Sequence, residues 1–239
     1  MKHLNLILII LILSCCPLHP AYAFFDKDIR LLTMRDGLAD NTIPCIYKDE
    51  DGFMWFGTDD GLSRYDGKTI QNFKPADTYA SVAAIVRLSD DFLGIVSDGY
   101  LYYFNRKQET FLPIHTESDT AIGVFNVLPA DNSSFWGISG NRLILCQWEI
   151  RQGKEEEKTA VRVRIQKTFQ LLEEKGEVFS SLCYHEKAGN GIWLTTNRGN
   201  LILFHPDTPE AYQKIPLTDG KPLQVTSILN RDGVVWIST

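Results

Sequence analysis

The sequence predicts an all-β fold, a β-propeller of four-stranded blades that is incomplete, with about four and a half blades of a larger, seven-bladed ring. Three observations predict it. A pattern of an Asp/Asn-Gly turn, a strand containing tryptophan and a second turn with glycine recurs along the chain. Runs of four to eight β-branched and aromatic residues lie between such turns, which is typical of strands. Most copies lie about 40 residues apart, the period of a propeller blade.

The repeat is clearest around Trp55, where the chain reads "DGFMWFGT", and it returns at the end as "DGVVWIST". Two further copies contain a tryptophan at the same place, and in the weakest copy Gly94 stands there. Each copy is flanked by further apolar runs, so we expect residues 24–239 to form a partial propeller. The predicted blades span about 40–75, 80–115, 120–172 and 178–216, followed by a half blade at 224–239.

The large residue of each repeat is expected to fill the space between neighbouring blades. A single small sheet cannot bury both of its faces, and packing blade upon blade buries them. The tryptophans are therefore interpreted as core residues and not as ligand-stacking groups. The predicted structural residues of the repeat are Trp55, Trp136, Trp193, Trp236, Gly57 and Gly61.

One step of the repeat is longer than the others and predicts a long hairpin insertion at 150–170 in the third blade. The charged run Lys154–Lys158 indicates a solvated tip, and "AVRVRIQ" alternates apolar and basic residues, which is typical of a strand with one buried face. The pattern leaves two roles open, an arm that binds a partner or a simple extension of the blade.

The N-terminus predicts an exported chain. Residues 1–23 have the features of a signal peptide: Lys2, an apolar stretch too short to span a bilayer, and the cleavage motif Ala21-Tyr22-Ala23. A second interpretation is a lipoprotein signal with the lipid on Cys15, and a third is an uncleaved membrane anchor. Either signal predicts a location on the periplasmic side of the inner membrane.

Composition excludes some classes of function. The formal net charge of −6 argues against a nucleic-acid-binding role, and 44% hydrophobic residues are ordinary for a globular protein. After residue 23 three cysteines remain, so they cannot all pair in disulfides. Cys45 and Cys183 each lie ten residues before a repeat tryptophan, and we interpret both as small buried residues near the propeller axis. No spacing predicts a metal site or a catalytic constellation, so no catalytic residue, metal or cofactor is predicted.

Residues 29–73 resemble the two-component regulator propeller repeat. The motif is carried by Asp36-Gly37-Leu38, by Asp49, Gly52 and Trp55, and by "DGLSRYDG" from Asp60 to Gly67. The resemblance implies the N-terminal periplasmic sensor region of a Bacteroidetes hybrid two-component system, a sensor histidine kinase protein. It also implies an oligosaccharide ligand, control of glycan-utilisation genes, a kinase module further along the same longer chain, and a possible homodimer.

In the resembled fold, ligands bind at the rim that carries the turn after the tryptophan strand and the links between blades. Planar hydrogen-bonding side chains and aromatic faces suit sugars. The predicted ligand-binding residues at this rim are Tyr79, Asp98, Tyr100, Arg142 and Arg198. Two other classes of function stay open: a free periplasmic propeller enzyme, such as a polysaccharide or lactone lyase, and a scaffold that binds another protein through the hairpin at 150–170.

Overall fold

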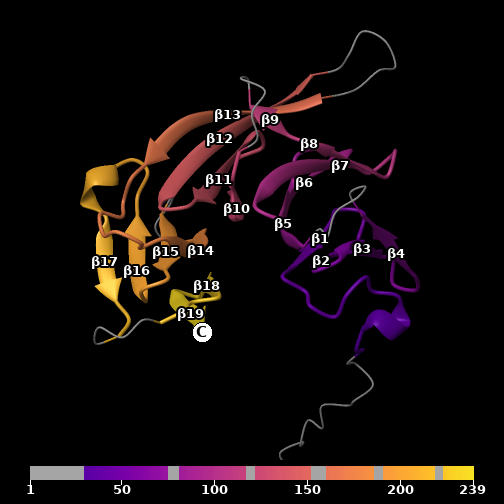
Figure 1. Cartoon of the computed structure of the whole chain (residues 1–239), viewed down its shortest axis with the longest axis horizontal. Helices are drawn as coiled ribbons and strands as arrows, with labels where there is room; N and C mark the ends of the chain where they lie inside the picture. Colours follow the sequence, from indigo (N-terminus) through magenta and orange to yellow (C-terminus); the bar gives the residue numbers. More distant parts are fainter. Residues whose placement is uncertain (1–29, 75–80, 117–121, 152–159, 186–190, 219–222) are drawn as a thin grey trace, which may run out of the picture. The chain divides into compact units, whose positions relative to one another are not determined.

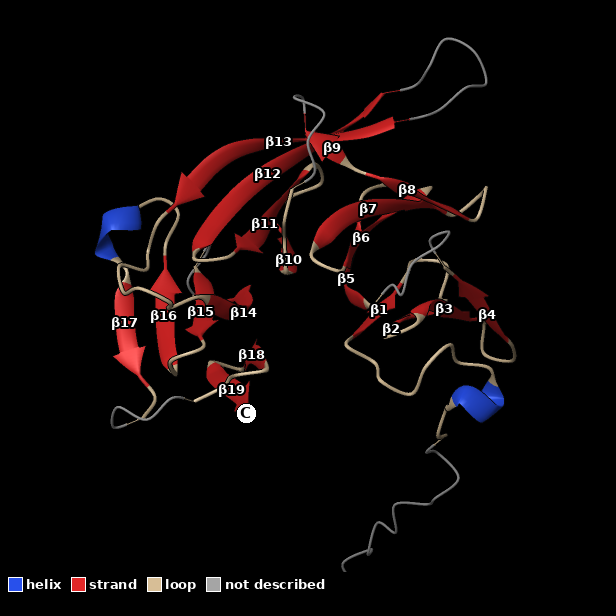
Figure 2. Cartoon of the chain, viewed as in Figure 1, coloured by secondary structure: helices blue, strands red, loops and turns tan. Residues whose placement is uncertain are grey.

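The computed structural model describes residues 30–74, 81–116, 122–151, 160–185, 191–218 and 223–239. The chain divides into two compact units, Met1–Leu32 and Thr33–Thr239. Of the first unit only residues 30–32 are described, so the predicted signal peptide and the alternative lipid site at Cys15 lie outside the described residues. In the second unit nearly all regular structure is strand (Figure 2).

Four sheets of the second unit contain four antiparallel strands in sequence order, and a two-stranded hairpin follows them. The first sheet contains β1 (Cys45–Lys48), β2 (Met54–Thr58), β3 (Gly61–Tyr65) and β4 (Ile70–Phe73). The second contains β5 (Val82–Arg87), β6 (Phe92–Ser97), β7 (Tyr100–Asn105) and β8 (Thr110–Pro113). The third contains β10 (Asn126–Pro129), β11 (Ser134–Ser139), β12 (Arg142–Arg151) and β13 (Ala160–Phe169). The fourth contains β14 (Phe179–Tyr184), β15 (Ile192–Thr196), β16 (Asn200–Phe204) and β17 (Gln213–Pro216). The hairpin is β18 (Ser227–Arg231) and β19 (Val234–Ser238), and the two short 3-10 helices are η1 (Met34–Asp36) and η2 (Pro209–Ala211).

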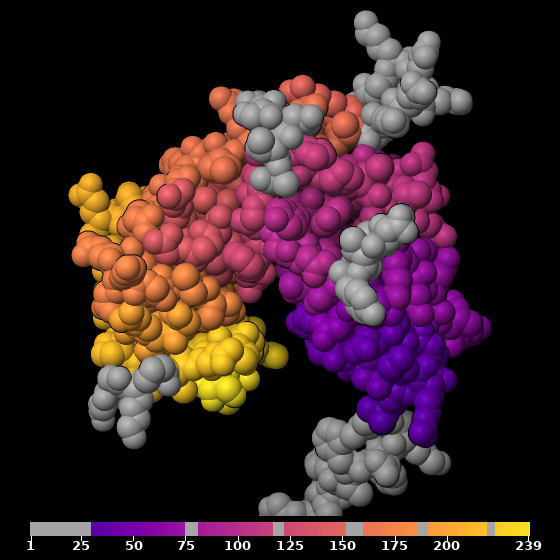
Figure 3. Space-filling model, in the orientation of Figure 1, coloured from indigo at the N-terminus to yellow at the C-terminus, as the bar shows by residue number. Residues whose placement is uncertain are grey.

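The sheets follow one another around a common centre. The first strand of each sheet contacts the first strand of the next, from β1 to β5, β10, β14 and β18 in turn. These inner strands surround the middle of the unit, while β4, β8 and β17 lie outside (Figure 1). The ring is open between the fifth sheet and the first (Figure 3). The predicted fold, an incomplete β-propeller, is confirmed, and the number of blades in a closed ring stays a prediction.

The third sheet differs from the expected four strands. A short strand, β9 (His115–Thr116), pairs in parallel with β13 opposite Arg162 and Val163. The strands β12 and β13 have ten residues each and pair along their lengths, with a register irregularity after Leu145. Val161 and Val163 are buried in the core between the second and third sheets. The described base of the predicted hairpin insertion is therefore part of this core.

An aromatic triad joins the first sheet to the second. Trp55 on β2 is fully buried and lies 5.6 Å from Phe104 of the second sheet, with their rings at 67°. Phe73 on β4 completes the triad, 4.9 Å from Phe104. Edge-to-face contacts at such distances are favourable beyond the area that they bury. The tryptophan thus fills the space between two sheets.

The same triad recurs between the third and fourth sheets. Trp136 is 5% exposed and lies 6.2 Å from Phe204 of the fourth sheet at 77°, and Phe169 lies 4.9 Å from Phe204. Trp193 is also buried, in the core that joins the fourth sheet to β18 and β19. Three of the four repeat tryptophans therefore lie between neighbouring sheets, as the repeat predicts.

The second sheet has Gly94 in place of tryptophan. A Cβ on this glycine would lie 2.8 Å from Val86 Cγ1 and 3.0 Å from Leu88 Cδ2, so a larger side chain fits there only if these neighbouring side chains move. The core between the second and third sheets instead includes Trp148, a residue of β12 that stacks on Phe135 with 5.6 Å between ring centroids. A tryptophan from the following sheet thus contributes the bulk that the repeat position lacks.

The prediction of a buried core residue is wrong for Trp236, which is 63% exposed. Its strand, β19, pairs only with β18 within the described residues, and the other tryptophans are buried by the sheet that follows theirs. With no further sheet packed against β19 in this part of the chain, the indole keeps contact with solvent.

Two predicted structural glycines lie where a side chain would not fit. A Cβ on Gly57 would lie 2.4 Å from Cys45 Sγ and 2.5 Å from the carbonyl oxygen of Val82, on the first strand of the next sheet. Gly61 has φ +111°, and a Cβ there would lie 2.6 Å from the carbonyl oxygen of Phe73. Gly57 allows the backbones of β2 and β5 to approach closely, and Gly61 allows a tight turn between β2 and β3.

The predicted equivalence of the two cysteines is wrong. Cys45 pairs with Gly57, two residues after Trp55, whereas Cys183 pairs with Trp193 itself. The connection from β14 to β15 (185–191) is longer than that from β1 to β2 (49–53), and an irregularity follows Phe179. Ser181, opposite Thr195, therefore occupies the position that Cys45 has in the first sheet.

Candidate functional site

The described ligand-site candidates lie in equivalent turns of three successive sheets. Asp98 and Tyr100 belong to the β6–β7 turn, Arg142 begins β12 after the β11–β12 turn, and Arg198 lies in the β15–β16 turn. All four are exposed. Tyr79 lies outside the described residues. Because the strands are antiparallel, these turns share one rim, opposite the β1–β2 type of turn.

The structure does not bring these residues into one constellation. Tyr100 forms an isolated bridge with Gly123 and is 50% exposed. Arg198 donates to Glu174 Oε2 at 2.6 Å and to the carbonyl oxygen of Lys175 at 2.8 Å, so its guanidinium holds the segment before β14. A ligand role for the five residues remains a prediction.

A buried carboxylate at the same rim has no signal in the sequence. Glu177 is 1% exposed and accepts hydrogen bonds from Thr196 Oγ1, Asn200 Nδ2 and Lys214 Nζ at 2.7–2.9 Å. Burial opposes ionisation of Glu177, but the hydrogen bonds from these three groups outweigh it, so its pKa lies below the ordinary value. Glu177 lies in the segment that connects β13 to β14. Its hydrogen bonds therefore hold this segment to β15, β16 and β17.

A cavity of about 660 Å³ opens on this rim, where β14 and β18 begin. Asn197 and Gln224 contribute amides to its wall, and Val178 contributes an apolar surface. The Asn197 side chain is already engaged, because it accepts from the Val178 amide at 3.0 Å and donates to the Gly176 carbonyl. Gln224 is exposed and leaves one planar hydrogen-bonding group on this wall for a ligand.

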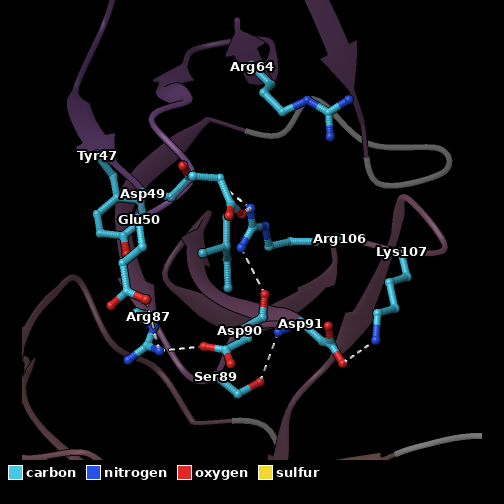
Figure 4. A pocket seen from close by; sticks show the side chains of 12 residues that line it. Tyr47, Asp49, Glu50, Arg64, Arg87, Ser89, Asp90, Asp91, Arg106 and Lys107 are labelled. Atoms are coloured by element: carbon cyan, nitrogen blue, oxygen red, sulfur yellow. Dashed lines mark hydrogen bonds and ion pairs between the residues drawn. The ribbon is translucent and has the colours of Figure 1, made fainter.

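A charged cavity of about 480 Å³ lies at the opposite rim, between the first and second sheets (Figure 4). Figure 4 shows the Arg106 guanidinium beside Asp49 and above Asp90. Arg106 pairs with Asp49 at 2.9 Å and with Asp51, and donates to the Asp90 carbonyl at 2.8 Å. Ion pairs also join Arg87 to Asp90 and to Glu50, and Lys107 to Asp91.

Asp49 connects this charged network to the aromatic triad. Its Oδ2 accepts from the indole Nε1 of Trp55 at 2.7 Å, and its Oδ1 accepts from the amide of Phe53 at 2.8 Å. The carboxylate is 6% exposed, so the Arg106 cation compensates a buried charge. The Asp of the repeat thus closes its own turn, orients the tryptophan and holds the next sheet.

Arg64 covers the triad from the solvent side. Its guanidinium lies over the rings of Phe53, Trp55 and Phe73 at 5.2–5.5 Å, and it pairs with Glu109 at 3.1 Å. A cation over an aromatic face is stabilising, and here several rings share it. We call Asp49, Arg64 and Arg106 together the polar clamp. The charged side chains that line the cavity of about 480 Å³ are all paired.

A third cavity, of about 720 Å³, lies at the same rim between the third and fourth sheets. Trp136 and Leu145 form part of its floor. Tyr184 lines it and donates from its hydroxyl to the carbonyl oxygen of Pro129. This cavity is larger than the charged cavity, and no ion pair joins the described residues that line it.

The three described thiols are poor nucleophiles. Burial raises the pKa of Cys45 and of Cys146 to about 12 and that of Cys183 to about 11.

Within the described residues, no group of three or more His, Cys, Asp or Glu side chains is placed to hold a metal ion. In the same part of the chain, no helix has the length and apolar character needed to cross a membrane.

Residues 37–60 match the model of the two component regulator propeller family. The match covers β1 and β2 and includes the Asp49–Trp55 pair. No curated protein sequence matches the chain significantly. The matched segment therefore contains Asp49, the first residue of the polar clamp along the chain.

Several solved structures are similar to this chain at low sequence identity. A streptogramin B lyase structure is 18% identical with a TM-score of 0.55, over 84% of this chain and 63% of that chain. The WD40 β-propeller domain of Doa1 is 10% identical with a TM-score of 0.57, over 82% and 60%. The extracellular domain of BT3049 from B. thetaiotaomicron, which is assigned to a hybrid two component system, is 17% identical with a TM-score of 0.54, over 88% and 34%.

This chain spans less than two thirds of the length of each of those three chains. At such identities the likeness establishes the architecture and no activity. The chain is an incomplete β-propeller in which residues 37–60, a segment that includes β1 and β2, match the two component regulator propeller family.

Proposed function

We propose that this chain is the ligand-sensing propeller of a transmembrane hybrid two-component receptor and that it works on the periplasmic side of the inner membrane. The observation that carries this proposal is the match of residues 37–60 to the two component regulator propeller family, in a segment that includes β1 and β2 of the first sheet. The likeness to the extracellular domain of BT3049 supports the same class of protein.

The proposed ligand is an oligosaccharide, and the proposed response is control of glycan-utilisation genes. Sugars are bound by planar hydrogen-bonding groups next to apolar or aromatic surface, and sites on propellers bring such groups together from several blades. The exposed positions of Tyr100 and Arg142 in equivalent turns support a hydrogen-bonding rim. The proposed partners are the oligosaccharide, a kinase module further along the same longer chain, and a second copy of the receptor.

We propose that this stretch is a binding module without chemistry of its own. The raised pKa values of Cys45 and Cys146 support that view, since thiolates are the nucleophilic form of cysteine. The second candidate is a free periplasmic lyase acting on a polysaccharide or lactone. Its support is the similarity of the fold to a streptogramin B lyase structure.

Reading the gene beyond codon 239 and assaying the encoded protein tests the receptor role. We expect an in-frame membrane helix and histidine kinase, whose autophosphorylation in vesicles changes when an oligosaccharide is added on the side of the propeller. A stop codon directly after Thr239, together with lyase activity of the purified chain on polysaccharide or lactone substrates, would overturn the receptor proposal in favour of the enzyme.

A further inference from the structure

The third and fourth sheets repeat the aromatic packing of the first and second sheets without the polar clamp. Trp136 meets Phe204 at 6.2 Å and 77°, much as Trp55 meets Phe104 at 5.6 Å and 67°. The strand registers therefore identify which residues of the third and fourth sheets stand where the clamp residues stand in the first and second.

The equivalent of Asp49 is an alanine. Asp49 lies two residues after Tyr47, the β1 partner of Trp55, and Ala130 lies two residues after Leu128, the β10 partner of Trp136. A methyl group has thus replaced the carboxylate that binds the tryptophan indole and the arginine of the next sheet.

The two arginines of the clamp are replaced as well. Arg64 pairs with Trp55 across β2 and β3, and Leu145 pairs with Trp136 across β11 and β12. Arg106 lies two residues after Phe104, and Pro206 lies two residues after Phe204. All three charged side chains of the clamp are therefore substituted by smaller or apolar ones.

The substitutions coincide with the larger cavity. Ala130, Trp136, Leu145 and Pro206 all line the cavity of about 720 Å³, whereas the clamped cavity measures about 480 Å³. Volumes of about 300–1,000 Å³ are typical of small-molecule sites, which combine an apolar lining with a few polar groups. The missing clamp leaves an apolar floor over the tryptophan.

The rim of this cavity carries polar groups that are available to a ligand. Lys167 on β13 and Asp207 after β16 line it, and neither makes an ion pair or side-chain hydrogen bond with another described residue. Asn132 is exposed at the β10–β11 turn and also lines the cavity. Gln166 also lines the cavity, and its amide donates to Gln147 Oε1 at 2.9 Å.

We propose that this cavity binds a neutral oligosaccharide, an inference that rests on the proposed sensor function. It places a ligand site at the rim opposite to the one that carries Tyr100 and Arg142. The apolar floor suits the C–H face of a sugar ring, and the ammonium, carboxylate and amides of the rim suit its hydroxyl groups. A neutral ligand is favoured over an anionic one because the lining carries two carboxylates, Asp131 and Asp207, and one cation, Lys167.

The test restores the clamp in the open cavity. The double variant Ala130→Asp/Pro206→Arg should place an ion pair across the cavity, as Asp49 and Arg106 do in the clamped one. Lys167→Ala removes one ligand contact without adding bulk, and Lys68→Ala, an exposed lysine of the first sheet, is the matched control. Titration calorimetry of the full chain against neutral gluco-, manno-, xylo- and galacto-oligosaccharides of about two to four units measures binding, and thermal unfolding checks that each variant folds.

We expect one of these oligosaccharides to bind the wild-type chain. Lys167→Ala should weaken that binding roughly ten-fold, the double variant should abolish it, and Lys68→Ala should leave it unchanged. Unchanged affinity in both the double variant and Lys167→Ala would place the ligand elsewhere, which overturns this inference and leaves the sensor proposal standing. A wild-type chain that binds none of the oligosaccharides overturns the assigned ligand, and the kinase assay on the complete receptor then decides the sensor proposal separately.

Discussion

The indole Nε1 of Trp55 donates a 2.7 Å hydrogen bond to Oδ2 of Asp49, and the same carboxylate oxygen accepts from Arg106 of the next sheet at 2.9 Å. Asp49 and Arg106 are 57 residues apart in the chain. One buried carboxylate therefore links a tryptophan that packs between two sheets to a cation from the second of those sheets. Substitutions can test this clamp, the close approach of the inner strands and the link between the third and fourth sheets separately.

Replacing Asp49 with alanine should lower the free energy of unfolding by about 2–4 kcal/mol, because it leaves the indole and the Arg106 cation without their buried acceptor. Glu50→Ala is the matched control in the same turn. Its carboxylate is 72% exposed and, among the described residues, forms an ion pair only with Arg87, so the free energy should stay within about 0.5 kcal/mol of the wild type. Urea unfolding of both variants measures the difference, and equal stabilities would contradict the clamp.

Replacing Gly57 with alanine should destabilise the chain by about 1–3 kcal/mol, because the new methyl group would press on the Cys45 thiol and the Val82 carbonyl. The control is Gly123→Ala, where the nearest atom to a Cβ lies 3.8 Å away. The control should be neutral or slightly stabilising, since alanine restricts the unfolded chain. Urea unfolding compares the two variants, and a Gly57→Ala variant as stable as the control would show that β2 and β5 do not approach each other as described.

Glu177 should make stability depend on pH. Its pKa is lower in the folded chain than the ordinary value of 4.5, so its charge contributes stability that is fully present above about pH 4.5 and is lost as the pH falls through the lower, folded pKa. Glu177→Gln should therefore lower stability at neutral pH by about 1–3 kcal/mol and flatten the acid limb of the stability curve. Glu173→Gln, on the exposed surface nearby, should retain the wild-type acid limb. An unchanged acid limb in Glu177→Gln would contradict the hydrogen-bonded network.

Much of this fold is predictable from the sequence because its main signal is local. The tryptophan and the two flanking turns lie within a few residues of one another, so the repeat is visible without knowledge of the packing. Trp236 shows the limit of that reasoning. Its burial depends on a neighbouring sheet, and the described residues contain none beyond β19.

The cavities depend on relations that cross sheets, and sequence reasoning missed them. The partnership of Asp49 with Arg106 joins two turns of different sheets, and no local motif indicates it. The equivalence of Ala130 and Pro206 to those residues becomes clear only from strand registers. Differences in turn length disturb a simple alignment, as Cys183 demonstrates. Glu177 lies in a link between blades, outside the repeated pattern.

A double-mutant cycle between Trp55 and Phe104, measured by urea unfolding, is the sharpest test of tryptophan packing between neighbouring sheets. With Trp55→Phe and Phe104→Leu we expect a coupling energy of about 0.5–1.5 kcal/mol, because the two rings touch across the sheets. A cycle between Trp236→Phe and Phe104→Leu should be additive, since that indole is 63% exposed. Additive effects for Trp55 and Phe104 would show that the indole does not join the first sheet to the second.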